Sequence, residues 1–134
     1  MTGIDVATIG GPHLTVSNAE LDAFVADRFA GVDFDGKSVV VVVPDATRSC
    51  PLPLMVATVH LHLIDRVASL TCVIALGTHS YMEPAEIDRW FGVGEGQTLE
   101  SLYPGMTVVN HEFLDHDQIV AIGTQLTESL AGLE

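Results

Sequence analysis

Five consecutive valines at residues 39–43 constrain the fold of this chain more than any other feature of its sequence. Valine is β-branched, which favours an extended strand over a helix. The run does not alternate with polar residues, which is typical of a strand covered on both faces by helices in a parallel sheet. Similar apolar runs follow at residues 70–76 and 106–109. We therefore expect strands over residues 38–43, 70–76 and 106–109.

Helix signals lie around and between the expected strands. Ser17 or Asn18 can cap one helix, and Pro84 suits the first turn of another. Further elements are expected after the third strand. The sequence predicts helices over residues 19–30, 84–91 and, weakly, 124–134, and a fourth strand over residues 118–122.

Residues 51–68 are ambiguous on their own pattern. Pro51 suits a first helical turn, whereas residues 56–64 alternate between apolar side chains and polar ones such as His60 and His62. Two parallel strands need a crossover connection, and that connection is usually a helix. The need for a crossover therefore favours a helix here.

This order of elements predicts one domain over residues 1–134, a Rossmann-like three-layer α/β sandwich with a mostly parallel sheet. Eighteen acidic residues against five basic ones give a net charge of −13. This charge excludes nucleic acid and an anionic membrane surface as the main partner. We expect no secretory signal, because the first residues have no basic and apolar regions, and no membrane span, because no apolar run reaches membrane length. Two cysteines are too few for a disulfide scaffold. We expect a cytoplasmic protein with Cys72 as a reduced core residue.

Polar side chains that can take part in binding or catalysis follow each of the three expected strands. Ligands of such sheets usually bind beyond the carboxyl ends of the strands. We therefore expect one crevice at this edge of the sheet. The candidate site residues are Asp45, Thr47 and Arg48 after the first strand, Gly77, Thr78 and His79 after the second, and Asn110 and His111 after the third.

The residue types suggest a role for each group. The Arg48 guanidinium is a planar fork that can pair bidentately with a carboxylate, or can instead form a salt bridge with Asp45 three residues earlier. His79 can exchange a proton near neutral pH, or can simply cap a turn. Gly77 allows a sharp turn and a close approach to a ligand. These observations leave both the functional and the structural interpretation open.

Several familiar sites are missing from the sequence. The glycines at 92, 94 and 96 do not form a dinucleotide fingerprint, and there is no phosphate-binding P-loop and no nucleophile elbow. His60 and His62 would face different sides of a helix, which predicts exposed residues and not a metal pair. Lys37 follows a turn and looks structural. No metal site is expected in this chain.

Five segments together resemble the nickel-pincer lactate racemase family. They are residues 39–48 (VVVVVPDATR), 51–54 (PLPL), 73–79 (VIALGTH), 90–92 (WFG) and 108–111 (VVNH). The D-x-T-R and G-T-H loops are weak signals separately and fairly specific together. The resemblance extends over about 87 residues, from 37 to 123, and it implies a helix at 51–66.

The resemblance implies an activity and roles for single residues. Members of the family isomerise 2-hydroxy acids such as lactate at C2, with a nickel pincer cofactor derived from nicotinic acid. The cofactor accepts a hydride while a histidine removes the hydroxyl proton. By position, Arg48 would hold the substrate carboxylate and Asp45 would line the same pocket. His79 would be one of two proton-transfer histidines, and Thr47 and Thr78 would shape the loops.

The family also implies what this chain does not contain. Its second proton-transfer histidine, the lysine that bonds the cofactor and the histidine that ligates nickel all lie well beyond the G-T-H loop, and a second domain closes over the cofactor. We therefore expect the N-terminal part of such an enzyme, with no cofactor and no activity on this chain alone. The expected partners are a small 2-hydroxy-acid substrate, a C-terminal domain or separate catalytic half, and a second copy of the chain, because an isolated half exposes apolar surface.

Two other functions remain open from the sequence. A stand-alone α/β domain could use the same loops to bind a small carboxylate, or could dock a separately encoded catalytic half. A different α/β enzyme could use Asp45 as a base or nucleophile, for example in phosphoryl chemistry. The small number of basic residues disfavours this last alternative, because a phosphate substrate needs positive charge.

Overall fold

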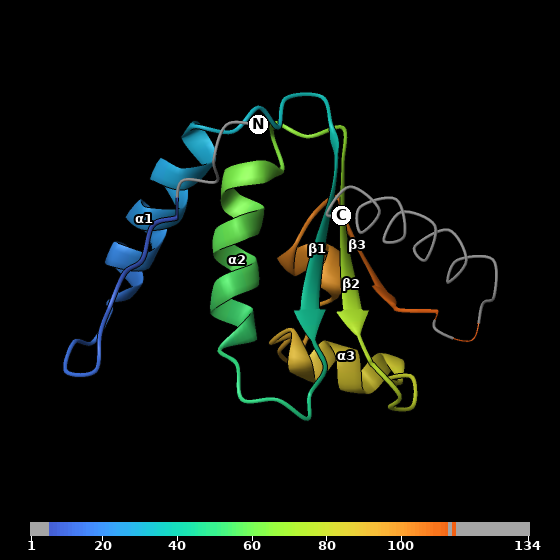
Figure 1. Cartoon of the computed structure of the whole chain (residues 1–134). Coiled ribbons are helices and arrows are strands. Elements are labelled where there is room, and N and C mark those ends of the chain that lie inside the picture. Colours follow the sequence, from blue (N-terminus) through green and yellow to red (C-terminus); the bar gives the residue numbers. More distant parts are fainter. Residues whose placement is uncertain (1–5, 113, 115–134) are drawn as a thin grey trace, which may run out of the picture.

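The computed structural model describes residues 6–112 and residue 114. Its elements are, in chain order, α1 (Asn18–Ala30), β1 (Ser38–Pro44), α2 (Leu52–Leu63), β2 (Ser69–Ala75), α3 (Pro84–Trp90), α4 (Leu99–Leu102) and β3 (Met106–Asn110). The strands form a parallel sheet in the order β1-β2-β3 (Figure 1). The predicted α/β class and parallel sheet are confirmed. The strand expected at 118–122 and the helix expected at 124–134 lie outside the described residues.

The sequence signals for the first helix correspond to a capping box. The Ser17 hydroxyl accepts a hydrogen bond from the Glu20 backbone N–H at 3.2 Å, and the Glu20 carboxylate accepts one from the Ser17 backbone N–H at 2.8 Å. Gly31 forms the C-cap. The helix predicted over residues 19–30 is therefore confirmed.

The ambiguous segment is helical as α2, although it ends before residue 66. Leu52, Val56 and Leu63 are buried, and the alternation that suggested a strand leaves Leu61 64% exposed. The polar residues of this alternation, His60 and His62, are half-buried, although exposed side chains were expected. Each imidazole ring has a hydrogen-bond partner. His60 Nε2 lies 2.8 Å from the Pro104 carbonyl, and His62 Nε2 lies 2.8 Å from Asp22 of α1.

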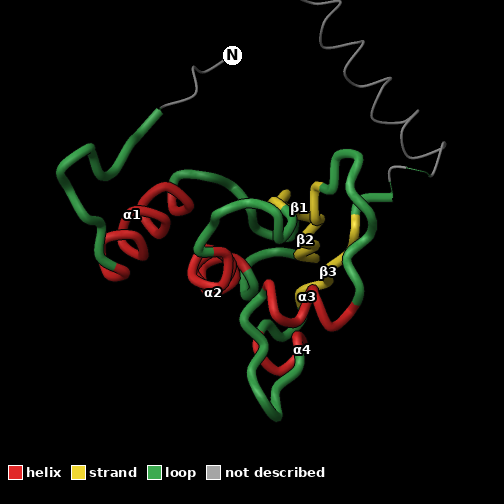
Figure 2. The backbone as a smooth tube through the Cα atoms, turned by 90° about the horizontal axis from the view of Figure 1, so that it is seen from below, coloured by secondary structure: helices red, strands yellow, loops and turns green. Residues whose placement is uncertain are grey.

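All the connecting helices cover the same face of the sheet. Consecutive parallel strands with right-handed crossovers place each crossover on one side. Figure 2 shows α2, α3 and α4 together on that side. The core lies between this helical layer and the sheet, and Cys72 is buried within it as a free cysteine, as predicted. Burial raises the pKa of the Cys72 thiol to about 12.

The opposite face of the sheet is open within the described part of the chain. Val40 and Val42 are 60% and 67% exposed, and Val109 on β3 is 40% exposed. The prediction that the valine run is covered on both faces is therefore wrong for these residues. The reason is topological, because the crossovers of a β1-β2-β3 order supply helices to one face only. The described residues form two layers of the three that were expected.

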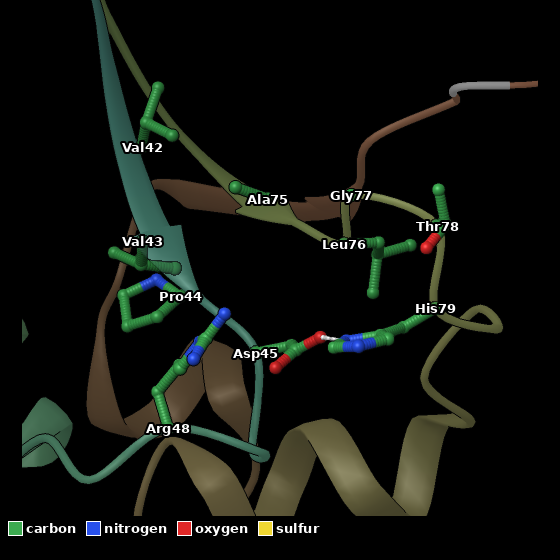
Figure 3. Close-up of a pocket in the computed structure, with 10 residues that line it drawn as sticks. All are labelled: Val42, Val43, Pro44, Asp45, Arg48, Ala75, Leu76, Gly77, Thr78 and His79. Carbon is green, nitrogen blue, oxygen red and sulfur yellow. Dashed lines mark hydrogen bonds and ion pairs between the residues drawn. The ribbon is translucent and has the colours of Figure 1, made fainter.

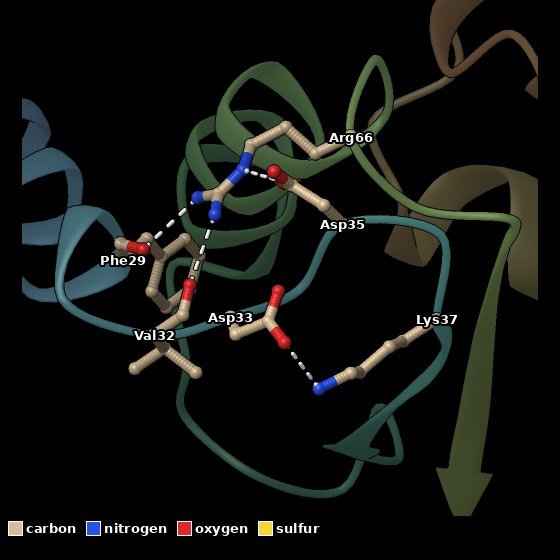
Figure 4. A network of polar contacts seen from close by, with 6 residues as sticks. All are labelled: Phe29, Val32, Asp33, Asp35, Lys37 and Arg66. Carbon is tan, nitrogen blue, oxygen red and sulfur yellow. Dashed lines mark hydrogen bonds and ion pairs between the residues drawn. The ribbon is translucent and has the colours of Figure 1, made fainter.

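Arg66 connects the end of α2 to the end of α1 and to the turn before β1 (Figure 4). Its guanidinium donates to the carbonyls of Phe29 and Val32 and to the carboxylate of Asp35, each at 2.9 Å. It also lies over the Phe34 ring, 5.6 Å from the centroid. This arrangement fixes where the chain enters β1.

Lys37 lies in the same turn and has a structural partner. Its Nζ donates to the Asp33 carboxylate at 2.7 Å, and both side chains are exposed. Lys37 precedes β1, so it lies at the opposite end of that strand from the candidate site. No helix among residues 6–112 and 114 has the length and apolar character needed to cross a membrane.

Candidate functional site

The loops after β1 and β2 begin side by side at the carboxyl edge of the sheet. The register pairs Pro44 with Ala75, the last residues of the two strands. A pocket of about 540 Å³ lies at this edge. Its lining residues are Val42, Val43, Pro44, Asp45, Arg48, Ala75, Leu76, Gly77, Thr78 and His79 (Figure 3). The structure thus brings five of the eight predicted site residues into one pocket.

Asp45 is the buried polar residue of this pocket and is 4% exposed. Its Oδ1 accepts hydrogen bonds from the Thr47 backbone N–H at 3.0 Å and from the Thr47 hydroxyl at 2.5 Å. Its Oδ2 lies 2.5 Å from His79 Nδ1. Thr47 does not line the pocket itself, and it acts on the pocket through Asp45.

These contacts keep Asp45 ionised. The hydrogen bonds from the Thr47 hydroxyl, from His79 and from the Thr47 backbone lower its pKa to about 2, against a smaller opposing effect of burial. Both carboxylate oxygens are therefore engaged in hydrogen bonds. This arrangement disfavours the alternative in which Asp45 is a nucleophile or the catalytic base, because neither oxygen faces a substrate without a competing donor.

Gly77 determines how the loop after β2 brings His79 to Asp45. Its φ of +62° lies in the left-handed region that favours glycine, while a Cβ there would meet no atom within 4 Å. The requirement is therefore for backbone conformation and not for space. The turn closes with a hydrogen bond from the His79 backbone N–H to the Leu76 carbonyl at 3.0 Å. The imidazole of His79 is 49% exposed, which leaves part of the ring facing the pocket.

Arg48 lies on the other side of the Asp45 carboxylate from His79 (Figure 3). Its backbone N–H donates to the Asp45 carbonyl at 3.2 Å, which closes the turn after β1. Within the described residues, the guanidinium has no hydrogen bond or ion pair, and the salt bridge to Asp45 considered from the sequence does not form. A cation with no side-chain partner among the described residues thus lies in this pocket, in a chain with a net charge of −13.

Asn110 and His111 line a different pocket from the other candidates. The Asn110 side chain donates to the Met82 carbonyl at 3.0 Å and accepts from the Met82 N–H at 3.1 Å, so it holds the loop after β2 in place. A second pocket, of about 530 Å³, lies on the open sheet face and includes Asn110 and His111. Val42 and Ala75 line both pockets, so the two are adjacent.

Trp90 is a contributor to the site that sequence reasoning missed. Its indole N–H donates to the Pro44 carbonyl at 2.9 Å, which ties the last residue of β1 to the end of α3. Phe91, the next residue, is fully buried and accepts a hydrogen bond from the Tyr103 hydroxyl at its carbonyl. The sequence shows an indole donor near the end of a helix but no signal for its acceptor 46 residues earlier.

The described residues do not offer a metal centre or a lysine to this pocket. No group of three or more His, Cys, Asp or Glu side chains among them is arranged to hold a metal ion. Lys37 is the only lysine of the sequence, and it is paired with Asp33 at the far end of β1. The residues described here therefore do not fit a cofactor held by a lysine bond and a nickel ligand.

One solved structure is similar to this fold. A protein from Thermotoga maritima matches with a TM-score of 0.63 and 21% sequence identity, over 82% of this chain and 24% of that one. This chain spans about a quarter of the length of that protein. At this identity the likeness supports the fold alone. A search of curated proteins finds no match.

The sequence itself matches a known family over most of its length. The family described as the lactate racemase N-terminal domain matches residues 15–129. This range contains the strands, the helices and both loops of the pocket. The chain belongs to the lactate racemase N-terminal domain family.

Proposed function

We propose that this domain binds the carboxylate of a small 2-hydroxy acid at Arg48 and exchanges the proton of its hydroxyl group with His79. In this proposal it is the N-terminal part of a 2-hydroxy-acid racemase or epimerase. The observation that carries the proposal is an arginine without a salt-bridge partner among the described residues, beside a histidine that is hydrogen-bonded to a buried aspartate. Family membership supports the same reaction class.

The negative net charge of the chain makes the binding of an anion depend on Arg48. A carboxylate that approaches a protein with a net charge of −13 meets an unfavourable long-range field, which salt screens in part. Binding then depends on a local cation, and Arg48 is the basic residue of the pocket. A bidentate pair between guanidinium and carboxylate contributes on the order of 1.5 to 3 kcal/mol, about ten- to a hundred-fold in affinity.

We assign the cofactor to the longer protein and not to the residues described here. In the proposal, a nickel pincer cofactor belongs to the complete enzyme. The lysine and the metal ligand that hold it come from a C-terminal domain or a separate catalytic half. This domain supplies the carboxylate anchor and one proton-transfer group. The absence of a suitable lysine or metal cluster among the described residues supports that division.

A second candidate is a carboxylate-binding domain with no catalytic partner. It is supported by the same unpaired guanidinium and by the lack of a metal cluster among the described residues. The two candidates differ in one measurable respect. Both predict binding of a 2-hydroxy acid, and only the first predicts interconversion of its enantiomers by the complete protein.

The test uses the complete protein that carries this domain. Racemisation of D- and L-2-hydroxy acids is measured by chiral chromatography, together with metal analysis and a mass spectrum that searches for a lysine adduct. The proposal expects interconversion, one nickel per chain and the adduct. A complete protein that binds 2-hydroxy acids and never interconverts them would support the second candidate.

Variants of the complete protein test the roles. Arg48→Lys keeps the charge but loses the fork, so kcat/KM should fall, and Arg48→Ala should lower it by about ten- to a hundred-fold. His79→Ala should lower kcat mainly, because it removes a proton acceptor and leaves the anchor. Arg89→Ala removes the same charge from an exposed position on α3 and is the matched control. An Arg48→Ala variant with unchanged kcat/KM would show that Arg48 does not hold the substrate.

A further inference from the structure

We propose that Asp45, itself held by Thr47, is a positioning residue that keeps the His79 proton on Nδ1 and thereby makes Nε2 the atom that exchanges a proton with the substrate. This inference rests on the proposed function for the identity of the substrate. The tautomer of His79 does not depend on that function and can be measured separately.

The first step is that Asp45 offers one oxygen to His79. Both donors of Thr47, the backbone N–H at 3.0 Å and the hydroxyl at 2.5 Å, bind Oδ1. The carboxylate can then rotate little, because rotation would break two hydrogen bonds. The remaining oxygen, Oδ2, lies 2.5 Å from His79 Nδ1. Thr47 thus determines which carboxylate oxygen meets the imidazole.

The second step concerns the donor and the acceptor in that contact. An ionised carboxylate is only an acceptor of hydrogen bonds, so His79 Nδ1 must be the donor. The low pKa of Asp45 supports an ionised carboxylate at neutral pH. A neutral imidazole carries one proton on its two nitrogens, and with that proton on Nδ1 the lone pair at Nε2 can accept another. Asp45 is 4% exposed, so water competes little for its oxygens.

The third step is access to the accepting nitrogen. The imidazole of His79 is 49% exposed and lines the pocket that also contains Arg48. Within the described residues, the one hydrogen bond of this ring is the bond at Nδ1. A 2-hydroxy acid held by its carboxylate at Arg48 would bring its hydroxyl group into the same pocket. The exposed part of the ring is therefore the part that a substrate can meet.

The proton transfer balances in this arrangement. The O–H bond of the substrate hydroxyl breaks, its electron pair stays on oxygen, and the proton forms a new N–H bond at Nε2. The resulting imidazolium faces the Asp45 carboxylate, which offsets its charge at 2.5 Å. The reverse transfer returns the proton to the oxygen. Asp45 itself accepts no proton at any stage.

Nitrogen-15 NMR of the histidine-labelled 134-residue chain tests the tautomer directly. Long-range correlations between ring protons and ring nitrogens distinguish a protonated Nδ1 from a protonated Nε2. The wild-type spectrum, recorded where the ring is neutral, should show the proton of His79 on Nδ1. A wild-type His79 with its proton on Nε2 would overturn the inference without any variant.

Two variants and a control test whether Asp45 and Thr47 determine the tautomer of His79. Asp45→Ala removes the acceptor and should return His79 toward the Nε2-protonated form that a free imidazole favours. Thr47→Val removes one donor to Oδ1 and should give a partial change, and it covers the case in which Asp45→Ala does not fold. Asp33→Asn changes a carboxylate that is paired with Lys37 at the far end of β1, and should leave His79 unchanged. An Nδ1-protonated His79 in a folded Asp45→Ala chain would refute the positioning role.

The complete protein separates this inference from the proposed function. Asp45→Asn should lower kcat with little change in KM, whereas Arg48→Ala changes kcat/KM through binding. If His79 has the expected tautomer but no 2-hydroxy acid is racemised, the proposed function fails and the positioning of His79 stands. If racemisation occurs and Asp45→Asn leaves kcat unchanged, the proposed function stands and the positioning inference fails.

Discussion

Asp45 should make the stability of this chain sensitive to acid in a specific range. The pKa of its carboxyl is lowered from 3.8 to about 2 in the folded chain, chiefly by the Thr47 hydroxyl and then by His79. A carboxyl with a lowered pKa stabilises the fold at pH values above its unfolded pKa. That stabilisation is complete above about pH 5 and is lost as the pH falls through 4 toward 2.

The magnitude follows from the same two values. Lowering a pKa from 3.8 to about 2, at about 1.4 kcal/mol per pKa unit, corresponds to about 2 to 3 kcal/mol of unfolding free energy at neutral pH, most of which is lost by pH 2. Asp45→Asn removes the titrating group. Between pH 6 and pH 2, the free energy of unfolding of the wild type should therefore fall by about 2 kcal/mol more than that of Asp45→Asn.

Urea unfolding at several pH values measures this difference. The fluorescence of Trp90, the only tryptophan of the sequence, can report unfolding, because its indole is hydrogen-bonded to the last residue of β1. The change in the free energy of unfolding with pH is measured within each variant, so any destabilisation by the substitution that does not depend on pH cancels. Glu95→Gln, at an exposed carboxyl outside the pocket, is the control. Equal acid sensitivity in the wild type and in Asp45→Asn would refute the assignment of the low pKa to Asp45.

Three further predictions concern the backbone, the core and the metal. Gly77→Ala should lower the free energy of unfolding by about 1 kcal/mol through its positive φ alone, because the new Cβ meets no atom within 4 Å. Gly36→Ala, at a φ of +69° and with the same open space, should cost about as much. Only Gly77→Ala should also change the NMR signals of His79. Phe91→Ala, at a fully buried ring, should lower the free energy of unfolding in urea by about 3 to 5 kcal/mol. Elemental analysis of the purified chain should find no stoichiometric nickel, and one tightly held nickel per chain would contradict our assignment of the metal to other residues.

The positions of the elements could be predicted because each is set by local physics. The capping pair of Ser17 and Glu20 acts within one helical turn, and the valine run has a strong preference for an extended backbone. The short helix α4 was missed, because its four residues carry too little pattern to distinguish them from a loop. Burial of the valines was predicted incorrectly at Val40 and Val42. A uniform apolar run is compatible with one covered face or with two, and the topology decides between them.

The composition of the site could be predicted better than its internal contacts. Polar residues that follow adjacent parallel strands must meet at one edge of the sheet, so Asp45 and His79 could be placed near each other. Their direct bond could not be predicted, because the sequence offers Arg48 as an equally reasonable partner for Asp45. Asn110 follows the same strand-end rule, yet it binds the backbone of Met82. Which groups the loops bring together depends on turns such as the one at Gly77.

The order of residues in the first loop addresses a conflict that the proposed chemistry creates. A carboxylate substrate needs the cation of Arg48, while a proton-accepting histidine needs the anion of Asp45, and the two charges lie in the same turn. An ion pair between them would remove both groups from the site. Thr47 stands between them and binds Oδ1 with two donors, while His79 occupies Oδ2. Three of the roughly four acceptor positions of the Asp45 carboxylate are thus occupied, and no ion pair joins it to Arg48 in the described part of the chain, so the guanidinium stays available for an anion that enters the pocket. The D-x-T-R sequence thus holds a cation and an anion in one turn without an ion pair between them.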